Sequence, residues 1–362
     1  MLPVGSLAKK TIMLDVDPVA PDPAVIRQAA AVLCSGGLVA FPTETVYGLG
    51  ANALDAEAVR GIFAAKDRPA YDPLIVHLAD VARLPDVVDA APPLAYDLAE
   101  TFWPGPLTLI LPRGPRVPAE VTAGGDTVAV RVPAHPVALA LIRAAGVPVA
   151  APSANRFGHI SPTQAAHVLA DLGGRVDVIL DGGATRVGVE STVLSLIVSP
   201  PAILRPGGTS REALARVLGD VCVVDHPTFT EVAPSPGTLM QHYAPRAKVT
   251  LYQGPDEAVL PVMREAASHL LAQGVRVGLL LAEEDVAAFA GLSVVLEIVG
   301  RRELLEEVAR QLFTSLRALD RAGVAVILAR DFGAAGLGLA IRDRLTRAAG
   351  GRVINVTASP SR

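Results

Sequence analysis

The chain has 362 residues, of which 51% are hydrophobic, and this length predicts two domains with enough apolar material for packed cores. The formal net charge is −4, which argues against a protein that binds nucleic acid or membrane surfaces through bulk positive charge. No segment resembles a signal peptide or reaches membrane-spanning length, so we expect a cytoplasmic protein without membrane contact. Cys34 and Cys222 lie far apart in apolar contexts, which predicts reduced thiols in the core.

Residues 11 to about 210 alternate short apolar runs with amphipathic helical patterns, which predicts an α/β domain. The predicted strands cover residues 38–41, 74–77, 107–111, 128–131, 149–151, 178–180, 193–196 and 203–205. The predicted helices cover residues 23–35, 56–65, 93–102, 135–145, 163–172 and 210–218. The first strand leads directly into a turn rich in Thr and Glu.

Residues 225–246 contain four prolines and no regular period, which predicts a linker or an extended arm. From residue 248 a second α/β pattern begins, with strands predicted at 249–252, 275–281, 293–299 and 324–329 and helices at 255–273 and 301–322. This alternation predicts a small parallel, Rossmann-like sheet. We therefore divide the chain into a domain at 1–224, a proline-rich linker at 225–247 and a second domain at 248–362.

Several common catalytic motifs are missing from the sequence: it holds no GxxxxGK[ST], no GxSxG and no HExxH or comparable metal-ligand spacing. We therefore predict no metal site built from protein ligands, and any nucleotide must be held by dispersed side chains. Gly336-Leu-Gly-Leu339 is an incomplete GxGxxG pattern and is weak evidence for a dinucleotide.

Lys66 and Arg68 precede Pro69, which ends a predicted helix. Two cations at this place can clamp phosphates, Arg as a fork and Lys as a point charge. The alternative is a solvated helix C-terminus, where cations interact favourably with the helix dipole. Spacing alone favours the solvated helix end.

His77 and Arg131 each close an apolar predicted strand. A histidine in that position is more often a hydrogen-bonded core residue than a functional one. Arg131 shares a strand face with Thr127 and must find an anion or remain hydrated. An internal acid and a substrate carboxylate are both open as its partner.

Hydroxyls, amides and charges gather at later strand ends: Ser153, Asn155, Ser161, Glu190, Ser191 and Arg205. Each has an ordinary structural explanation, such as turn formation for Ser153 and Asn155 or helix capping for Ser161. Together they favour one shared pocket for a small polar substrate and a polyphosphate.

Five segments, taken in order, resemble the Sua5/YrdC family of threonylcarbamoyl-adenylate synthases. They are Phe41-Pro-Thr-Glu-Thr-Val-Tyr-Gly-Leu-Gly50, Lys66-Asp-Arg-Pro69, Trp103-Pro-Gly-Pro-Leu-Thr108, Ala151-Pro-Ser-Ala-Asn155 and Leu204-Arg-Pro-Gly207. The tail at 336–345 resembles the extra Sua5 domain. The resemblance implies a YrdC-like twisted mixed-sheet domain followed by a small Rossmann-like α/β domain.

The resemblance also implies an activity: L-threonine, bicarbonate and ATP give threonylcarbamoyl-AMP and pyrophosphate, with Mg²⁺ on the phosphates. The product would pass to the tRNA threonylcarbamoyl-transfer machinery, which forms threonylcarbamoyladenosine at tRNA position 37. Around threonine the resemblance places Thr45, His77, Arg131, Ala151 and Ser191. Around ATP it places Lys66, Arg68, Asp72, Thr127, Ser153, Asn155, Ser161, Arg205 and Tyr243.

Lys66 and Arg68 would act catalytically by neutralising growing charge, and Tyr243 with His242 would cover the nucleotide as a lid. Two features depart from the family pattern: Asp72 stands where many relatives have Asn, and residues 238–241 lack the usual basic side chains. Two alternatives remain open, namely an RNA-binding module with a weak contact to RNA and a regulator that senses threonine or a nucleotide.

Overall fold

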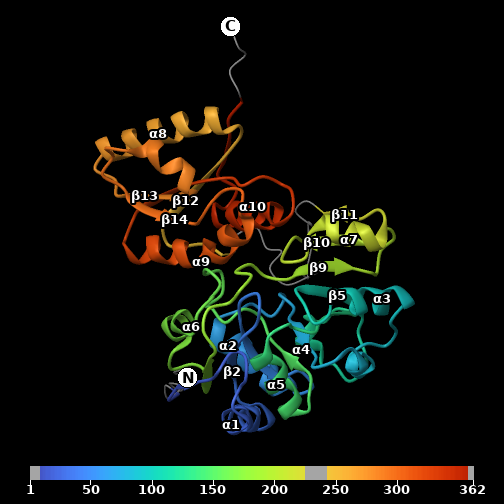
Figure 1. Cartoon of the computed structure of the whole chain (residues 1–362). Coiled ribbons are helices and arrows are strands. Elements are labelled where there is room, and N and C mark those ends of the chain that lie inside the picture. Colours follow the sequence, from blue (N-terminus) through green and yellow to red (C-terminus); the bar gives the residue numbers. More distant parts are fainter. Residues whose placement is uncertain (1–8, 225–242, 358–362) are drawn as a thin grey trace, which may run out of the picture.

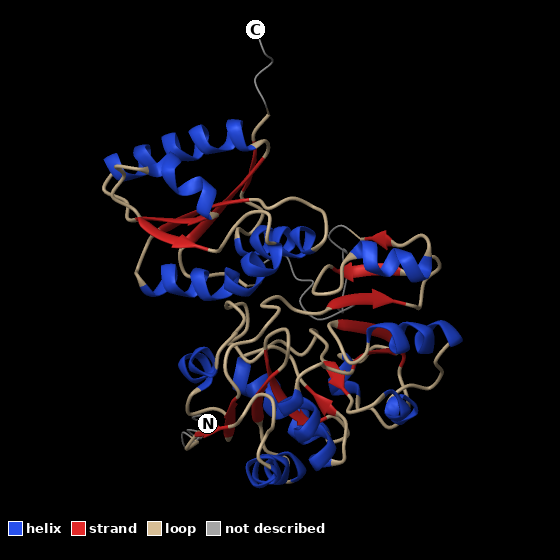
Figure 2. Cartoon of the chain, in the orientation of Figure 1, coloured by secondary structure: helices blue, strands red, loops and turns tan. Residues whose placement is uncertain are grey.

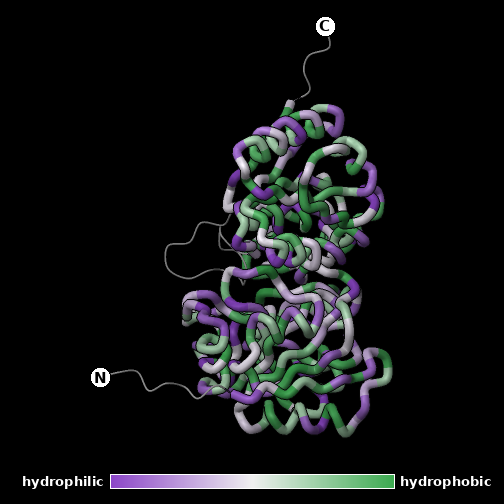
Figure 3. Tube along the Cα trace, turned by 90° about the vertical axis from the view of Figure 1, so that its left-hand side faces the viewer, coloured by the Kyte–Doolittle hydropathy of each residue, from purple (hydrophilic) through white to green (hydrophobic). Residues whose placement is uncertain are grey.

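The computed structural model describes residues 9–224 and 243–357 and contains two β-sheets in two parts stacked end to end (Figure 1). The view turned by 90° shows the same stacking (Figure 3). The first sheet has eleven strands in the order β1-β8-β2-β3-β7-β4-β6-β5-β9-β10-β11. Parallel and antiparallel neighbours alternate irregularly across it, so the predicted mixed sheet is confirmed.

The strands of this sheet are short. Their bounds are β1 Ile12–Asp15, β2 Val39–Pro42, β3 Tyr47–Asn52, β4 Ile75–His77, β5 Leu107–Pro112, β6 Thr127–Arg131, β7 Val149–Ala150, β8 Val178–Asp181, β9 Thr192–Ser195, β10 Ala202–Arg205 and β11 Cys222–Val223. All eight strands predicted for this part are present, while β1, β3 and β11 were not predicted.

Glycine explains why β3 was missed, because it has low β-propensity and lies twice in this strand. A Cβ on Gly50 would come within 2.8 Å of both Phe41 and Val149. The glycine therefore lets β3 pack closely between β2 and β7. The predicted turn after β2 is present at residues 43–46, and only the strand that follows it was missed.

Helices cover both faces of the first sheet (Figure 2). Their bounds are α1 Pro23–Cys34, α2 Ala56–Lys66, η1 Val81–Asp86, α3 Pro93–Phe102, α4 Ala119–Thr122, α5 Pro136–Ala145, α6 Ala165–Leu172 and α7 Arg211–Leu218. Strand alternation decides which face a side chain joins. Val39 and Phe41 pack under α1 and α5, whereas Leu38 and Ala40 belong to the larger core on the opposite face.

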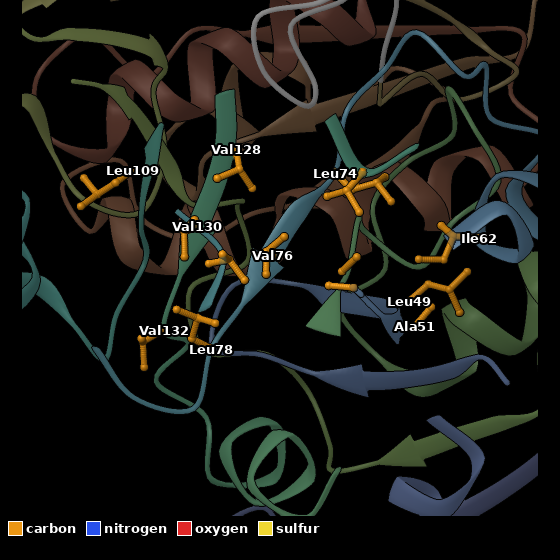
Figure 4. Packing of buried hydrophobic residues seen from close by; sticks show 14 of the residues in the cluster. Leu49, Ala51, Ile62, Leu74, Val76, Leu78, Leu109, Val128, Val130 and Val132 are labelled. Atoms are coloured by element: carbon orange, nitrogen blue, oxygen red, sulfur yellow. The ribbon is translucent and has the colours of Figure 1, made fainter. Parts of the chain in front are cut away.

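The larger core runs along several strands at once. Leu49, Val76, Leu109 and Val130 come from four different strands and meet Ile62 of α2 in the same cluster (Figure 4). This packing fixes the strand ends at which the candidate site residues lie.

The second sheet has five strands, all parallel, in the order β14-β13-β15-β12-β16. The bounds are β12 Lys248–Gln253, α8 Asp256–Ala272, β13 Val277–Leu281, η2 Glu283–Phe289, β14 Val295–Ile298, α9 Leu305–Arg321, β15 Val326–Arg330, α10 Leu337–Ala348 and β16 Val353–Asn355. The predicted parallel sheet is confirmed, although α10 and β16 were not predicted. The boundaries at 224 and 247 remain predictions, since residues 225–242 lie outside the described chain.

Helices α9 and α10 lie between the two sheets and join the two parts through one core (Figure 1). Val46, Ile160 and Val189 of the first part pack in the same apolar cluster as residues of α9 and α10. Arg317 of α9 also pairs with Asp171 of α6 at 2.6 Å. The second part is therefore packed directly against the loops at one end of the first sheet.

The prediction that the cysteines are core thiols is wrong: both Cys34 and Cys222 are free and exposed. Cys34 is the last residue of α1, and Cys222 begins the edge strand β11, so apolar neighbours in the sequence do not bury either thiol. Within the described residues, no helix is long and apolar enough to cross a membrane.

Candidate active site

A small cavity lies at the end of the first sheet that faces α9 and α10. Its lining comes mostly from strand ends and the turns beside them: Thr43, Thr45, Val46, Gly48, Arg68, Ile75, His77, Arg131, Ala151, Pro152, Ser153, Glu190, Ser191, Arg205 and Tyr243. Most of the predicted site residues thus meet at one place. The free space is only about 40 Å³, which is much less than a small-molecule site usually offers.

Arg131 lies at the end of β6, and each of its three guanidinium nitrogens has a close protein neighbour. Nη1 donates to Thr45 Oγ1 at 3.0 Å, Nε donates to the Gly105 carbonyl at 3.0 Å, and Nη2 lies 2.7 Å from Glu44 Oε1. Arg131 and Glu44 are both buried. The internal acid that the sequence left open therefore exists, and Arg131 still lines the cavity.

His77 is buried at the end of β4 and also lines the cavity. Its ring meets Phe41 edge-on at 6.3 Å, and its Nδ1 makes no hydrogen bond with any described residue. Burial, followed by the nearby Arg131 charge, lowers the pKa of His77 to about 3. The imidazole is therefore neutral near pH 7 and offers a polar nitrogen without a charge.

The prediction of a solvated helix end at Lys66 and Arg68 is wrong, because both side chains are buried. Asp67 adopts a left-handed backbone with φ 55°, which ends α2 and turns the chain inward. Lys66 Nζ donates to the carbonyl oxygens of Ser153, at 2.5 Å, and Asn155. Burial, and then the Arg68 charge, hold the pKa of Lys66 well below its usual range.

Arg68 lines the cavity, and Asp72 is its counter-ion. The two side chains form a buried ion pair at 2.9 Å, and Arg68 Nη2 also donates to the Pro73 carbonyl at 2.8 Å. An acid that is already paired with a cation repels phosphate much less than a bare acid does. Lys66, in contrast, lies behind the wall of the cavity and holds the 151–155 turn in place.

Asn155, Ser161 and Thr127 do not line the cavity. Asn155 Nδ2 donates to the carbonyls of Arg156 and His159 at 2.7 and 2.8 Å. Ser161 does not cap α6, whose N-cap is Gln164; its hydroxyl donates to Glu190 Oε1 at 2.5 Å instead. Thr127 is half-buried at the first position of β6, four residues before Arg131.

Arg205 and Ser191 form another part of the wall. Arg205 Nη2 donates to the Ser191 carbonyl at 3.0 Å and to its hydroxyl at 3.2 Å. The Ser191 hydroxyl also contacts Thr108 Oγ1 at 2.8 Å. Burial lowers the pKa of Arg205, which nevertheless remains a cation beside the cavity.

Tyr243 closes the cavity from the side of the second sheet. Its backbone has φ 62°, its side chain is buried, and its ring stacks on Phe313 of α9 with centroids 5.7 Å apart. Burial raises the pKa of the Tyr243 hydroxyl, so the phenol is neutral. His242, the other residue of the predicted lid, lies outside the described residues.

The residues of this region that were not predicted as site residues include Glu44, Thr108 and Arg344. Glu44 and Thr108 lie inside the motifs that carried the family resemblance, which was the available signal. Arg344 lies in the tail at 336–345 that resembles the Sua5 domain, but no local pattern linked it to the cavity, because it belongs to α10, far along the chain. Among the described residues, no group of three His, Cys, Asp or Glu side chains is placed to hold a metal ion.

Buried arginines, hydroxyls and a neutral imidazole around one cavity define an α/β protein that receives a small polar substrate together with an anion. Residues 31–207 match the Sua5, YciO and YrdC family described as "Telomere recombination". Residues 209–350 match the family described as "Threonylcarbamoyl-AMP synthase, C-terminal domain".

Relatives with both parts are similar over nearly their full length. A threonylcarbamoyl-AMP synthase of Pyrococcus abyssi is 47% identical over 338 residues, covering 91% of this chain and 96% of that protein. One of Bacillus subtilis is 48% identical over 331 residues, covering 91% and 94%. The crystal structure of P. abyssi Sua5 with L-threonine matches with a TM-score of 0.90 at 44% identity, covering 95% of this chain and 99% of that chain. The chain belongs to the two-domain Sua5 family of threonylcarbamoyl-AMP synthases.

Proposed function

We propose that this chain converts L-threonine, bicarbonate and ATP to L-threonylcarbamoyl-AMP and pyrophosphate at the cavity described above. The enzyme class follows from the close relatives, which carry this activity in their names. The observation that carries the site assignment is the convergence of Arg68, Arg131 and Arg205 with His77 and Ser191 on one cavity.

Threonine binds on the side of Thr45, His77, Arg131, Ala151 and Ser191. Arg131 takes the carboxylate, because its guanidinium is held in place by Glu44 and Thr45 and cannot turn away. The neutral His77 accepts a hydrogen bond from the amine or hydroxyl without adding a second positive charge. An internal acid and a substrate carboxylate were both open as partners of Arg131. In this proposal Arg131 has both, because Glu44 orients it for the substrate carboxylate.

The reaction needs positioning more than a protein nucleophile. The threonine amine takes up bicarbonate as a carbamate with loss of water, a carbamate oxygen attacks the α-phosphorus, and pyrophosphate leaves. Arg68 and Arg205 neutralise charge on the phosphates, with Mg²⁺ bound to the phosphate oxygens. Lys66 acts indirectly, since its terminal amine donates to the Ser153 and Asn155 carbonyls and so orients the 151–155 turn.

The cavity must open before the substrates enter, because about 40 Å³ does not hold ATP. Tyr243 is the group whose displacement enlarges it, since this side chain enters from outside the first sheet. Asp72, Thr127, Ser153, Asn155 and Ser161 remain proposed ATP contacts that this rearrangement brings into play. The product then passes to the tRNA threonylcarbamoyl-transfer machinery for position 37.

A sensor function for the second sheet is the less favoured alternative. Ligands of doubly wound folds bind at the carboxyl ends of parallel strands. At that edge Arg330 ends β15 and pairs with Asp256 and with the buried Asp285, and Arg302 pairs with the same two acids. The edge is therefore filled by the protein's own ion pairs.

The test is pyrophosphate release from ATP, measured with and without threonine and bicarbonate. We expect release that requires both, and a loss of release in Arg131→Ala with the fold retained. Arg60→Ala is the matched control, because this arginine is half-exposed on α2 and pairs with Glu57 and Glu120 away from the cavity. ATP binding without threonine-dependent release would instead favour a sensor, and retention of RNA alone would favour an RNA-binding module.

A further inference from the structure

The loop at residues 188–191 is held from the second part of the molecule at each of its first three positions. Gly188 has φ 82° and lies against the α9 backbone so closely that a Cβ would come within 2.3 Å of the Ala309 carbonyl oxygen. Val189 is buried in the core shared with α9 and α10. Glu190 bonds to Arg344, and Ser191 then faces the cavity. The position of Ser191 thus depends on α9 and α10.

Arg344 is the polar part of this attachment. Its side chain is completely buried, and its Nε donates to Glu190 Oε2 at 2.6 Å, while Nη1 donates to Asp343 at 2.5 Å. The other carboxylate oxygen of Glu190 accepts from Ser161. One guanidinium therefore fixes an acid that borders the cavity and, through it, a proposed ATP contact.

The same guanidinium also lies over Tyr243. Its central carbon is 5.1 Å from the centroid of the ring, within the range of a cation–π contact. Phe313 of α9 stacks on that ring as well. Two contacts of the Tyr243 ring therefore come from the second part.

Simple attachment of the two parts does not require Arg344. Arg317 already bridges them through Asp171, and apolar residues of α9 and α10 bury a shared core. A buried ion pair adds little net stability compared with apolar packing, because desolvation offsets most of the attraction. A role in arranging the site accounts for a buried charge here better than stability does.

We propose that Arg344 is a positioning residue of the active site. Helix α10 of the second part therefore helps to arrange the active site of the first part. Arg344 sets Glu190 and Tyr243, and through Glu190 it positions Ser191 of the cavity wall and the hydrogen-bonded Ser161. The inference rests on the proposed function, since it concerns the same cavity. A lysine cannot replace Arg344, because a point charge does not serve Glu190, Asp343 and the Tyr243 ring together.

The test compares Arg344→Gln and Arg344→Lys with the full-length wild-type protein by threonine-dependent pyrophosphate release. We expect Arg344→Gln to lower kcat/KM about 100-fold, the size of effect that misplaced reacting groups produce. Arg344→Lys should recover less than a tenth of the wild-type value. Arg342→Gln is the matched control on the same helix, because Arg342 pairs with Asp331 inside the second part. It should keep kcat/KM within about threefold of wild type.

A double variant separates positioning from loss of stability. If Arg344 acts through Glu190, the double variant Arg344→Gln with Glu190→Gln should have a kcat/KM no lower than that of the less active single variant. If the two residues act independently, the two reductions in kcat/KM should multiply. Circular dichroism and melting curves identify any variant that is unfolded at the assay temperature. If Arg344→Gln is unfolded, Arg344→Lys replaces it in the comparison of single and double variants. Folded Arg344 variants with wild-type kcat/KM, or multiplying effects, overturn this inference alone. An inactive wild-type protein would instead overturn the proposed function.

Discussion

The buried neutral His77 makes a quantitative prediction about acid stability. The ordinary histidine pKa is 6.5, and in the folded protein burial and Arg131 lower the pKa of His77 to about 3. The unfolded chain therefore binds a proton below pH 6.5 that the folded chain does not bind until about pH 3. With this sign, the stabilising contribution is present above pH 6.5 and is lost as the pH falls from 6.5 towards 3.

The size of the effect follows from the linkage relation. Between pH 7 and pH 5 the unfolded state gains nearly one proton at this site and the folded state gains almost none, which costs about 2 kcal/mol of unfolding free energy. The result hardly depends on the folded pKa as long as it lies below about 4. His135 and His167 are also buried, and burial lowers the pKa of each to about 4, so they act in the same direction.

The assay is urea unfolding followed by circular dichroism at pH 7, 6 and 5. His77→Gln should reduce the loss of unfolding free energy between pH 7 and pH 5 by about 2 kcal/mol, because glutamine takes up no proton. Ser153→Ala is the control, since it changes the same cavity without removing a titrating group. Parallel losses in wild type and His77→Gln would refute a neutral buried imidazole.

Three further predictions concern turnover. Arg131→Lys should raise the KM for threonine at least about tenfold with a smaller change in the KM for ATP, because the lysine ammonium cannot form the two parallel hydrogen bonds by which arginine holds a carboxylate. Initial-rate kinetics measure both KM values, and equal changes in the two would contradict the assignment. Lys66→Met should lower kcat/KM about 100-fold in a folded protein, because the Ser153 and Asn155 carbonyls lose their donor and the 151–155 turn shifts. Pyrophosphate release measures kcat/KM, and a wild-type value would show that the turn keeps its position without Lys66. EDTA should abolish pyrophosphate release and added Mg²⁺ should restore it, whereas release that persists in EDTA would argue against a metal on the phosphates.

Most of the fold was accessible from the sequence because hydrophobic periodicity reports local structure. Several of the predicted strands have continuous apolar runs, such as residues 38–41, and the long helices have clear amphipathic patterns. β3 and α10 lacked those signals. Two glycines interrupt the β pattern of residues 47–52, and α10 follows Gly336, an N-cap with a positive φ of 56° and no side chain to signal a helix start, and carries several arginines.

Burial of charged side chains was the main property that the sequence did not reveal. The isolated spacing of Lys66 and Arg68 fits a solvated helix end, and only the left-handed turn at Asp67 directs them inward. Arg344 and Glu190 are separated by 154 positions, so no local pattern connects them. The prediction for the two cysteines erred in the opposite direction, since it expected burial and the thiols are exposed. Apolar neighbours along the chain do not bury a residue at a helix end or on an edge strand.

The ion pairs of the buried arginines show that a structural role and a functional role do not exclude each other. Without substrate, a buried guanidinium needs a counter-charge, since desolvation of an unpaired ion costs several kcal/mol. Arg131 has Glu44, Arg68 has Asp72 and Arg344 has Glu190. Each acid holds its arginine in one orientation and leaves the site near neutrality, so an arriving carboxylate or phosphate meets donors that are already placed. Arg131, which ends an apolar strand, therefore has an internal acid as its partner and is at the same time oriented for the substrate carboxylate that we propose it binds.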